Sequence, residues 1–158
     1  MALKKGYTAK LYRNSATYGT PTWVEIDNVR DVNFPHAYEK LEATTRASGG
    51  VKEYEPGELE LSFSFKIRSD EADTDFTSLE TAYLARSLID LMILDGDKAT
   101  NGSRGYRYEA KVFSMGEDQA IGNILFRDVE VGPCISANAK ATVVVASGAP
   151  VFTTIAVA

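Results

Sequence analysis

The chain has few of the residues that build metal centres and disulfide frameworks. Among its 158 residues there is one cysteine, Cys134, and one histidine, His36. An internal disulfide, a cysteine-based zinc finger and a multi-histidine metal site are therefore excluded. Most metalloenzyme and catalytic-triad mechanisms lose their central residues for the same reason.

An excess of basic charge is also missing. Seventeen Lys and Arg residues against 22 Asp and Glu residues give a formal net charge of −5 at pH 7. A protein that grips nucleic acid by its phosphates needs a surplus of Lys and Arg on the contact surface, so repulsion is favoured over binding. No apolar run approaches the length of about 18 residues that a membrane-spanning helix needs, and residues 1–6 are not followed by an apolar stretch. We expect a chain made and folded in the cytoplasm, without a membrane anchor.

What is present is ordinary for one globular domain covering residues 1–158. Hydrophobic residues make up 44% of the chain and charged residues 25%, which excludes a wholly disordered chain, a collagen-like repeat and a coiled coil. A chain of this length buries roughly 70% of its unfolded surface on folding, so we expect one core.

The main pattern is the period of two that is typical of strands with one buried face. It is clearest over residues 58–68, where every odd position from Leu59 to Ile67 is apolar and every even position is polar. Such alternation puts one face on a core and the other against water or an aqueous channel. Further strands are predicted at residues 7–13, 23–32 with a break at Asp27-Asn28, 38–46, 106–114, 120–131, 141–146 and 151–155.

One helix is predicted over about residues 76–92. Thr77 and Glu80 have the spacing of a capping box, and Leu79, Ala82 and Tyr83 begin an apolar stripe. Residues 91–94 are apolar throughout and fit either the helix end or a short buried strand. The sequence therefore predicts a mainly β (α+β) fold: a β-sandwich or barrel of packed antiparallel sheets, with one flanking helix and a long hairpin excursion.

No catalytic, metal or cofactor site is predicted. The acidic loops at residues 70–75 and 95–97 lack the spacing of a calcium EF-hand, and helix capping explains them better than ion binding. His36 has no recognisable nucleophile beside it in the sequence, and Cys134 is most simply a small buried hydrophobe. The segment 102–105 lacks the spacing of a phosphate loop.

The two ends of the chain differ in charge. Before Glu25 every charged side chain is positive, and beyond Lys140 no charged side chain remains. An uncharged, β-prone segment templates aggregation unless it is covered. Residues 142–145 fit a central strand, whereas the segment from Val151 onward fits equally well on a neighbouring subunit. We expect the terminal arms, residues 1–8 and 147–158, to make such contacts through Lys4, Lys5, Val151, Phe152 and Ile155.

The order of these parts resembles the tail tube (major tail) proteins of long-tailed bacteriophages and their relatives in secretion and injection tubes. The elements that match are the opening at residues 23–32, the strand into residues 42–46, the polar excursion to Gly57, the alternating strand 58–68, an acidic link, one helix and a return to strands. The resemblance implies a β-sandwich subunit that forms hexameric rings, stacked into a hollow tube through which the genome passes. It also implies a location in the virion tail after assembly in the host cytoplasm, and contacts with tape-measure, tail-tip and tail-terminator proteins.

Two surfaces are predicted to serve such a tube. Residues 44–57 form a long insertion that we expect to be an assembly loop, because long insertions in compact domains are usually functional or disordered. Its contact residues are Arg46, Gly49, Gly50, Lys52, Glu53, Tyr54 and Glu55, with Tyr54 as the anchor. The even face of the 58–66 strand and the strand before it are expected to line the bore, where carboxylates keep DNA phosphates from sticking. These lining residues are Glu42, Thr44, Glu58, Glu60, Ser62 and Ser64, and Lys66 and Arg68 at the far end temper their charge.

Two other functions remain open. One is a tube component of a secretion or contractile injection system with the same fold. The other is a ligand-binding β-sandwich, which would be expected to expose aromatic residues on a loop or a flat face. The one tryptophan, Trp23, begins a strand with alternating partners, which favours a core or interface position.

Overall fold

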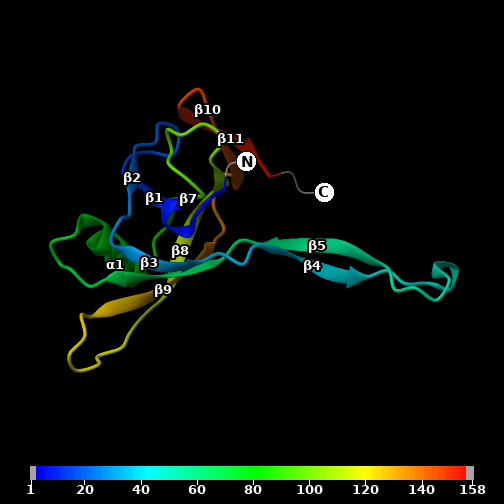
Figure 1. The fold of residues 1–158 in the computed structure, drawn as a ribbon, viewed down its shortest axis with the longest axis horizontal. Coiled ribbons are helices and arrows are strands. Elements are labelled where there is room, and N and C mark those ends of the chain that lie inside the picture. Colours follow the sequence, from blue (N-terminus) through cyan, green and yellow to red (C-terminus); the bar gives the residue numbers. More distant parts are fainter. Residues whose placement is uncertain (1–2, 156–158) are drawn as a thin grey trace.

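A computed structural model describes residues 3–155. It has a β-rich body from which one hairpin projects far to the side (Figure 1). The strands are β1 (Lys10–Asn14), β2 (Trp23–Glu25), β3 (Val29–Asn33), β4 (Ala37–Glu42), β5 (Tyr54–Glu60), β6 (Phe63–Arg68), β7 (Ile89–Leu94), β8 (Arg104–Glu117), β9 (Phe126–Pro133), β10 (Ala141–Ala146) and β11 (Ala149–Thr154). The helices are α1 (Thr74–Ala85) and the short 3-10 turns η1 (Gly6–Thr8) and η2 (Arg46–Ser48). Within residues 3–155 no helix is long and apolar enough to cross a membrane.

Nine strands form one antiparallel sheet that folds over on itself, so that the half β8-β9-β6-β3 faces the half that contains β1, β2 and β7. The order is β2-β1-β7-β8-β9-β6-β3, and β10 adds to β8 with β11 beyond it. The long strand β8 joins the two halves: residues 105–110 pair with β7, residues 104–107 with β10, and residues 110–117 with β9. Gly105 is required where β7 and β8 run side by side, because a Cβ there would lie 1.7 Å from the Ile93 carbonyl oxygen.

The main core lies between the two halves of this sheet. Phe65 and Ile67 of β6 meet Leu91 of β7 and Tyr108 of β8, and each is at most 2% exposed. The Tyr108 hydroxyl donates to the Leu61 carbonyl oxygen at 2.5 Å. Burying side chains of this size stabilises the fold by about 1.5–3 kcal/mol each. The predicted core face of residues 61–67 is thereby confirmed.

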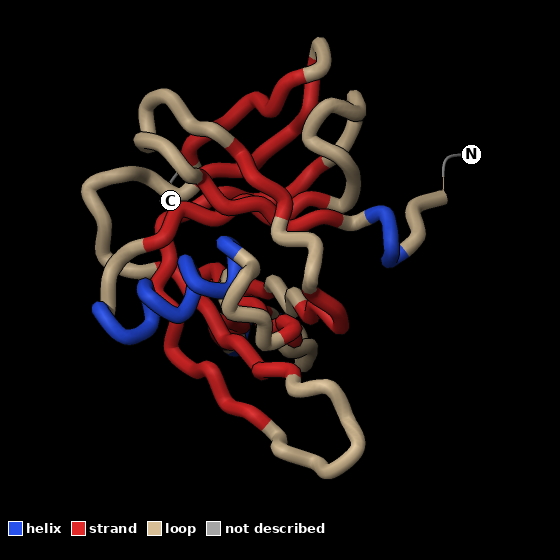
Figure 2. Tube along the Cα trace, turned by 90° about the vertical axis from the view of Figure 1, so that its left-hand side faces the viewer, coloured by secondary structure: helices blue, strands red, loops and turns tan. Residues whose placement is uncertain are grey.

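The helix α1 closes one side of the core, as Figure 2 shows. It packs against β8 and buries Phe76 and Leu79. An ion pair between Arg13 of β1 and the buried Asp75, with Nε and Oδ1 2.5 Å apart, ties its first turn to the sheet. The flanking helix and the mainly β fold with antiparallel sheets are as the sequence predicts.

The predicted boundaries of the helix are wrong at both ends. Its N-cap is Asp73, whose carboxylate accepts from the Asp75 backbone N–H, and the Thr77 hydroxyl instead donates to carbonyl oxygens of the first turn. The helix ends at Ala85 because Arg86 adopts a left-handed conformation, with φ of 52°. Residues 89–94 are the strand β7, so of the two readings of residues 91–94 the buried strand is correct. Both faces of β7 are covered, so residues 91–94 are apolar without alternation. A short apolar run of this kind has no hydrophobic periodicity that would distinguish a strand from a helix.

The predicted strand 58–68 is two strands in two different sheets. β5 pairs with β4 in a separate two-stranded sheet, and β6 pairs with β3 and β9 in the body. The break lies at residues 61 and 62, where the Ser62 backbone N–H and hydroxyl both donate to the Glu60 carboxylate. The alternation continues through the break, because Leu61 is buried like the odd positions of β6.

Candidate assembly surfaces

The hairpin of β4 and β5 stands clear of the body (Figure 1). All six residues of β4 are exposed, and each strand of the hairpin pairs only with the other among residues 3–155. A two-stranded hairpin in water is marginally stable at best, and this one offers two free edges and both faces to a neighbour. It is therefore the first candidate for an assembly surface.

The tip of the hairpin is an ordered turn. Thr45 and Ser48 form a reciprocal capping box around η2, and Ser48 also donates to the Glu53 carboxylate at 3.0 Å. Gly49 and Gly50 have φ of 65° and 84°, a backbone conformation that glycine adopts without strain. The two glycines therefore form a defined turn at the tip. Of the predicted loop residues, Arg46, Gly49, Gly50, Lys52 and Glu53 lie in the tip, and Tyr54 and Glu55 lie in β5.

The pairing register sorts the hairpin residues onto two faces. Glu42 lies opposite Tyr54 and Lys40 opposite Pro56, so these residues share a face with Glu58 and Glu60. The Lys40 ammonium lies 5.4 Å from the centre of the Tyr54 ring. A bulge between residues 38 and 40 puts the exposed side chains of Tyr38 and Leu41 on the opposite face, together with Leu59. One face of the hairpin is thus charged and the other is partly apolar.

The predicted bore-lining residues fall into separate groups. Glu42, Glu58 and Glu60 lie on the charged hairpin face, whereas Thr44 lies in the tip, where its side chain accepts from the Glu53 backbone N–H. Ser62 and Ser64 belong to the body, on the outer face of the sheet half β8-β9-β6-β3. The hydrogen bond from the Ser62 hydroxyl, with that from its backbone N–H, lowers the pKa of Glu60 below its ordinary value of 4.5.

This outer face carries both signs of charge. Ser64 pairs with Glu130 across β6 and β9, and Lys66 pairs with Asp128. The Lys66 ammonium and the Asp128 carboxylate are 3.9 Å apart. The surface predicted to line the bore with carboxylates therefore carries both positive and negative side chains where it runs over the body. Asp128 and Glu130 were missed, although their alternation with Val129 and Val131 was a usable signal.

The sheet half with this polar face has two open edges. Among the described residues β3 pairs with β6 alone, and residues 111–117 of β8 pair with β9 alone. Unpaired backbone N–H and C=O groups along such edges are ready to pair with another chain. Because the edges lie at opposite ends of the sheet half, copies of the chain can join edge to edge without using the same strand twice.

The described parts of the two terminal arms, residues 3–8 and 147–155, make contacts within their own chain, and residues 1–2 and 156–158 of the predicted arms lie outside the described residues. The Lys4 ammonium donates to Asp95 at 2.6 Å and to the Gly102 carbonyl oxygen at 3.2 Å, and Lys5 is the residue that precedes η1. The predicted strand from Val151 onward is β11, which pairs with β10 of the same subunit. Ile155 continues this hairpin through its backbone N–H, which donates to Lys140, and packs against the main core. Residues 142–145 are in a central strand as predicted, and the outer edge of β11 is what remains for a neighbour.

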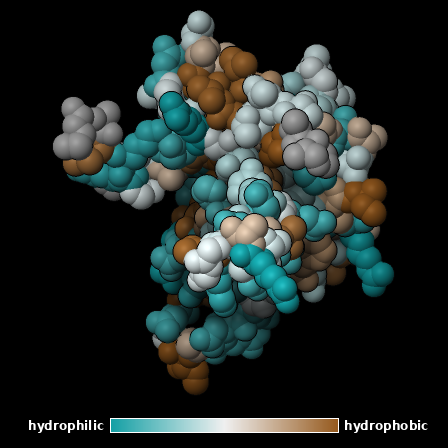
Figure 3. Space-filling model, turned by 90° about the vertical axis from the view of Figure 1, so that its right-hand side faces the viewer, coloured by the Kyte–Doolittle hydropathy of each residue, from teal (hydrophilic) through white to brown (hydrophobic). Residues whose placement is uncertain are grey.

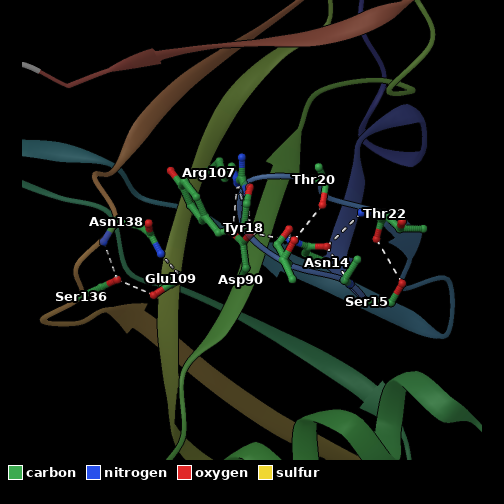
Figure 4. A network of polar contacts seen from close by, with 12 residues as sticks. Asn14, Ser15, Tyr18, Thr20, Thr22, Asp90, Arg107, Glu109, Ser136 and Asn138 are labelled. Atoms are coloured by element: carbon green, nitrogen blue, oxygen red, sulfur yellow. Dashed lines mark hydrogen bonds and ion pairs between the residues drawn. The ribbon is translucent and has the colours of Figure 1, made fainter.

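A buried arginine holds the C-terminal hairpin to the body (Figure 4). Arg107 is 3% exposed, and its guanidinium pairs with Asp90 at 2.6 Å and donates to the Tyr18 carbonyl oxygen at 2.9 Å. The guanidinium carbon lies 3.8 Å from the ring centre of Tyr18, 4.8 Å from Trp23 and 4.6 Å from Phe152. This cluster joins β8, β7, the 15–22 loop and β11, so Phe152 is an internal anchor of its own subunit.

Comparison with solved structures identifies the fold. The chain superposes on a chain of the tail of an empty gene transfer agent particle, refined with C6 symmetry, with a TM-score of 0.68, 14% identity, and coverage of 96% of this chain and 100% of that one. It superposes on the SPP1 tail tube with a TM-score of 0.67 and 12% identity, over 97% of this chain and 80% of that one. The chain has the fold of tail-tube subunits.

The same fold extends to injection machines. A chain of the sheath–tube complex of an extracellular contractile injection system matches with a TM-score of 0.57 and 10% identity, over 97% of this chain and 93% of that one. No protein-family model and no curated protein sequence matches the chain. The similarity to these solved structures is therefore one of three-dimensional fold, at sequence identities to this chain of 10–14%.

Proposed function

We propose that this protein is a structural subunit that self-assembles into stacked rings and forms a hollow tail tube. The observation that carries the proposal is the isolated β4–β5 hairpin, whose exposed strands, two free edges and ordered tip make little sense on a monomer. The superposition on the gene transfer agent tail and the SPP1 tail tube supports it. Rings of six are proposed because the gene transfer agent tail has C6 symmetry.

Ring closure is proposed to use the two open edges of the sheet half β8-β9-β6-β3. The edge strand β3 of one subunit pairs with residues 111–117 of β8 in the next, and repetition closes the sheets into a barrel without free edges. The polar outer face, with Ser62 and Ser64, then lines the bore. Glu60 at the base of the hairpin adds a carboxylate that stays ionised to lower pH than an ordinary Glu.

The tube is proposed to serve as a conduit for DNA in a virion tail. Repetition of Glu58, Glu60 and Glu42 around a ring adds single carboxylates into a field that keeps phosphates from binding tightly, so DNA passes without specific contacts. Assembly in the host cytoplasm, with tape-measure, tail-tip and tail-terminator proteins as partners, belongs to the same proposal. The hairpin, with its tip residues, is the assembly element that reaches a neighbouring subunit.

A second proposal is a tube of a contractile injection system. The match to a chain of a sheath–tube complex supports it. The two differ in their surroundings, because the tube of the matched injection system belongs to a sheath–tube complex. Copurification of a sheath protein with native tubes would favour the injection system, whereas packaged DNA in the native particle would favour the virion tail.

Electron microscopy of the purified full chain tests the shared part of both proposals. Negative-stain images are expected to show rings or tubes with a central channel once the concentration exceeds a threshold. A chain that stays monomeric by light scattering across a wide range of concentration and salt would overturn the tube proposal and return the ligand-binding sandwich to consideration.

A further inference from the structure

Two exposed apolar patches lie outside the surfaces described so far. The turn patch is Ile121 and Ile124, in the turn of residues 118–125 between β8 and β9, where the two side chains are 103% and 71% exposed. The helix patch is Tyr83, Leu84 and Leu88, in the last turn of α1 and the link to β7, with exposures of 37%, 72% and 41%. Apolar side chains gathered in this way on a small body mark contact surfaces.

The two patches occupy different parts of the subunit. The β8–β9 turn is the lowest part of the molecule in Figures 1 and 2, and α1 lies higher and to the side. The space-filling view shows that the tip of this lowest projection is hydrophobic (Figure 3). The turn is therefore shaped as a knob, and the helix patch belongs to the side of the body.

Each patch has one charged residue that pairs with no other side chain of the described range, and these two charges have opposite sign; Glu80, one helical turn before Leu84, is already paired with Arg127. Asp118 is the one charged residue of segment 118–125, and Arg86 is the one charged residue of segment 81–88. Both are exposed, and neither makes an ion pair or a side-chain hydrogen bond with another residue of the described range 3–155. The left-handed backbone of Arg86 ends the helix and fixes where this side chain leaves the body.

We propose that the turn patch of one subunit docks on the helix patch of a second copy, with Asp118 beside Arg86. Two like patches facing each other would bring two Asp118 or two Arg86 side chains together, and like charges across an interface disfavour that pairing. Contact between unlike patches leaves one free patch on each partner, so it propagates as a ring or a stack instead of closing as a dimer. The inference rests on the proposed tube and names one of the contacts that builds it.

The apolar side chains and the charges do different work in this contact. Burial of the two isoleucines against the helix patch supplies most of the affinity. The exposed ion pair adds little free energy, but it selects the orientation and the partner. Salt is therefore expected to weaken discrimination between pairings more than it weakens assembly as a whole.

A charge exchange tests the contact. The threshold concentration for assembly is measured by sedimentation. Relative to wild type, it is expected to rise roughly fivefold for each docking contact that a subunit makes, both in Asp118→Lys and in Arg86→Glu. The double variant, with both charges reversed, is expected to return to within about threefold of wild type. Asp27→Lys is the matched control, because Asp27 is exposed and distant in sequence from both patches; it is expected to leave the threshold unchanged.

Apolar variants separate this inference from the tube proposal. Ile124→Ser and Leu84→Ser are each expected to raise the threshold tenfold or more while the melting temperature of the monomer stays near that of wild type. If wild type forms tubes and both serine variants form them equally well, the docking contact is refuted and the tube proposal stands. A double charge variant no better than the single ones refutes the Asp118–Arg86 pairing. Failure of wild type to assemble refutes both proposals.

Discussion

At the scale of single residues, the Arg107 cluster shows why some important side chains escape sequence reasoning. The alternation of β8 predicts that residue 107 points away from the main core, and it does. Its guanidinium is nevertheless buried, because the 15–22 loop and β11 cover that second face and bring Tyr18 and Phe152 onto it. Tyr18 and Phe152 are 89 and 45 residues away from Arg107 in the chain, and no local sequence pattern predicts that they meet.

Removal of Asp90 is expected to destabilise the monomer strongly. Asp90→Ala leaves the Arg107 charge buried without its carboxylate, and breaking such a pair costs about 3–5 kcal/mol. For a chain of this size the melting temperature is expected to fall by roughly 6–20 °C, measured by calorimetry or circular dichroism. Asp27→Ala is the control, since Asp27 is exposed. Equal melting temperatures for the two variants would contradict the importance of the pair.

The Glu60 carboxyl is expected to titrate below the ordinary range of glutamate. Hydrogen bonds from Ser62 stabilise its charged form and lower its pKa from 4.5. Any stability from these bonds is present above the pKa of the unfolded chain and is lost as the pH falls through the lower folded value. NMR titration of the carboxyl carbon is the measurement. Ser62→Ala should move the pKa of Glu60 back towards 4.5, and an unchanged value would show that the serine hydroxyl has no such role.

At the scale of elements, the sequence predicts faces better than it predicts ends. The buried odd positions from Leu61 to Ile67 follow directly from alternation, and the strand 141–146 follows from its uncharged, β-prone composition. The division into β5 and β6 does not, because the alternation runs unbroken through Ser62 while the pairing partner changes from β4 to β9. Pairing depends on residues distant in sequence, so neither this break nor the open edge of β8 could be predicted.

Shortening the hairpin is expected to separate folding from assembly. Replacement of residues 43–53 by a two-residue turn removes only the tip and leaves the main core intact. The melting temperature of the monomer should change by less than about 2 °C, because surface changes away from the core have small effects. Electron microscopy should show no long tubes. A variant that still builds normal tubes would show that the tip is not an assembly element.

At the scale of the whole molecule, the candidate site is a set of surfaces spread over the subunit. Glu42, Glu58 and Glu60 share one hairpin face as the register requires, but the body face beyond them mixes Lys66 with Asp128 and Glu130. From the sequence, the alternation of residues 58–68 could indicate a polar face along one strand. The charges that neighbouring strands add to that face become visible only with the sheet order.

Reversal of charge on the hairpin face is expected to slow passage of DNA. With Glu58→Lys and Glu60→Lys together the subunit should still fold, because neither side chain is in the core, and tubes should still form if this face lines the bore rather than contacting a neighbour. Rings of lysine would attract phosphates, so genome delivery from particles carrying these tubes should fall, most at low salt where screening is weak. Release of DNA in time, followed by dye fluorescence, is the measurement. Delivery at the normal rate at every salt concentration would place these residues outside the bore.

The length of β8 gives the subunit a mechanical property. Its 14 residues span roughly 45 Å of extended backbone, from the C-terminal hairpin at one end to the β8–β9 turn at the other. Hydrogen bonds to neighbouring strands run along the whole of β8, on both flanks at residues 105–107 and 110, so stretching it along its length requires many of them to shear at once. A force that a neighbouring subunit applies to the β8–β9 turn would therefore be transmitted along β8 to the opposite end of the subunit.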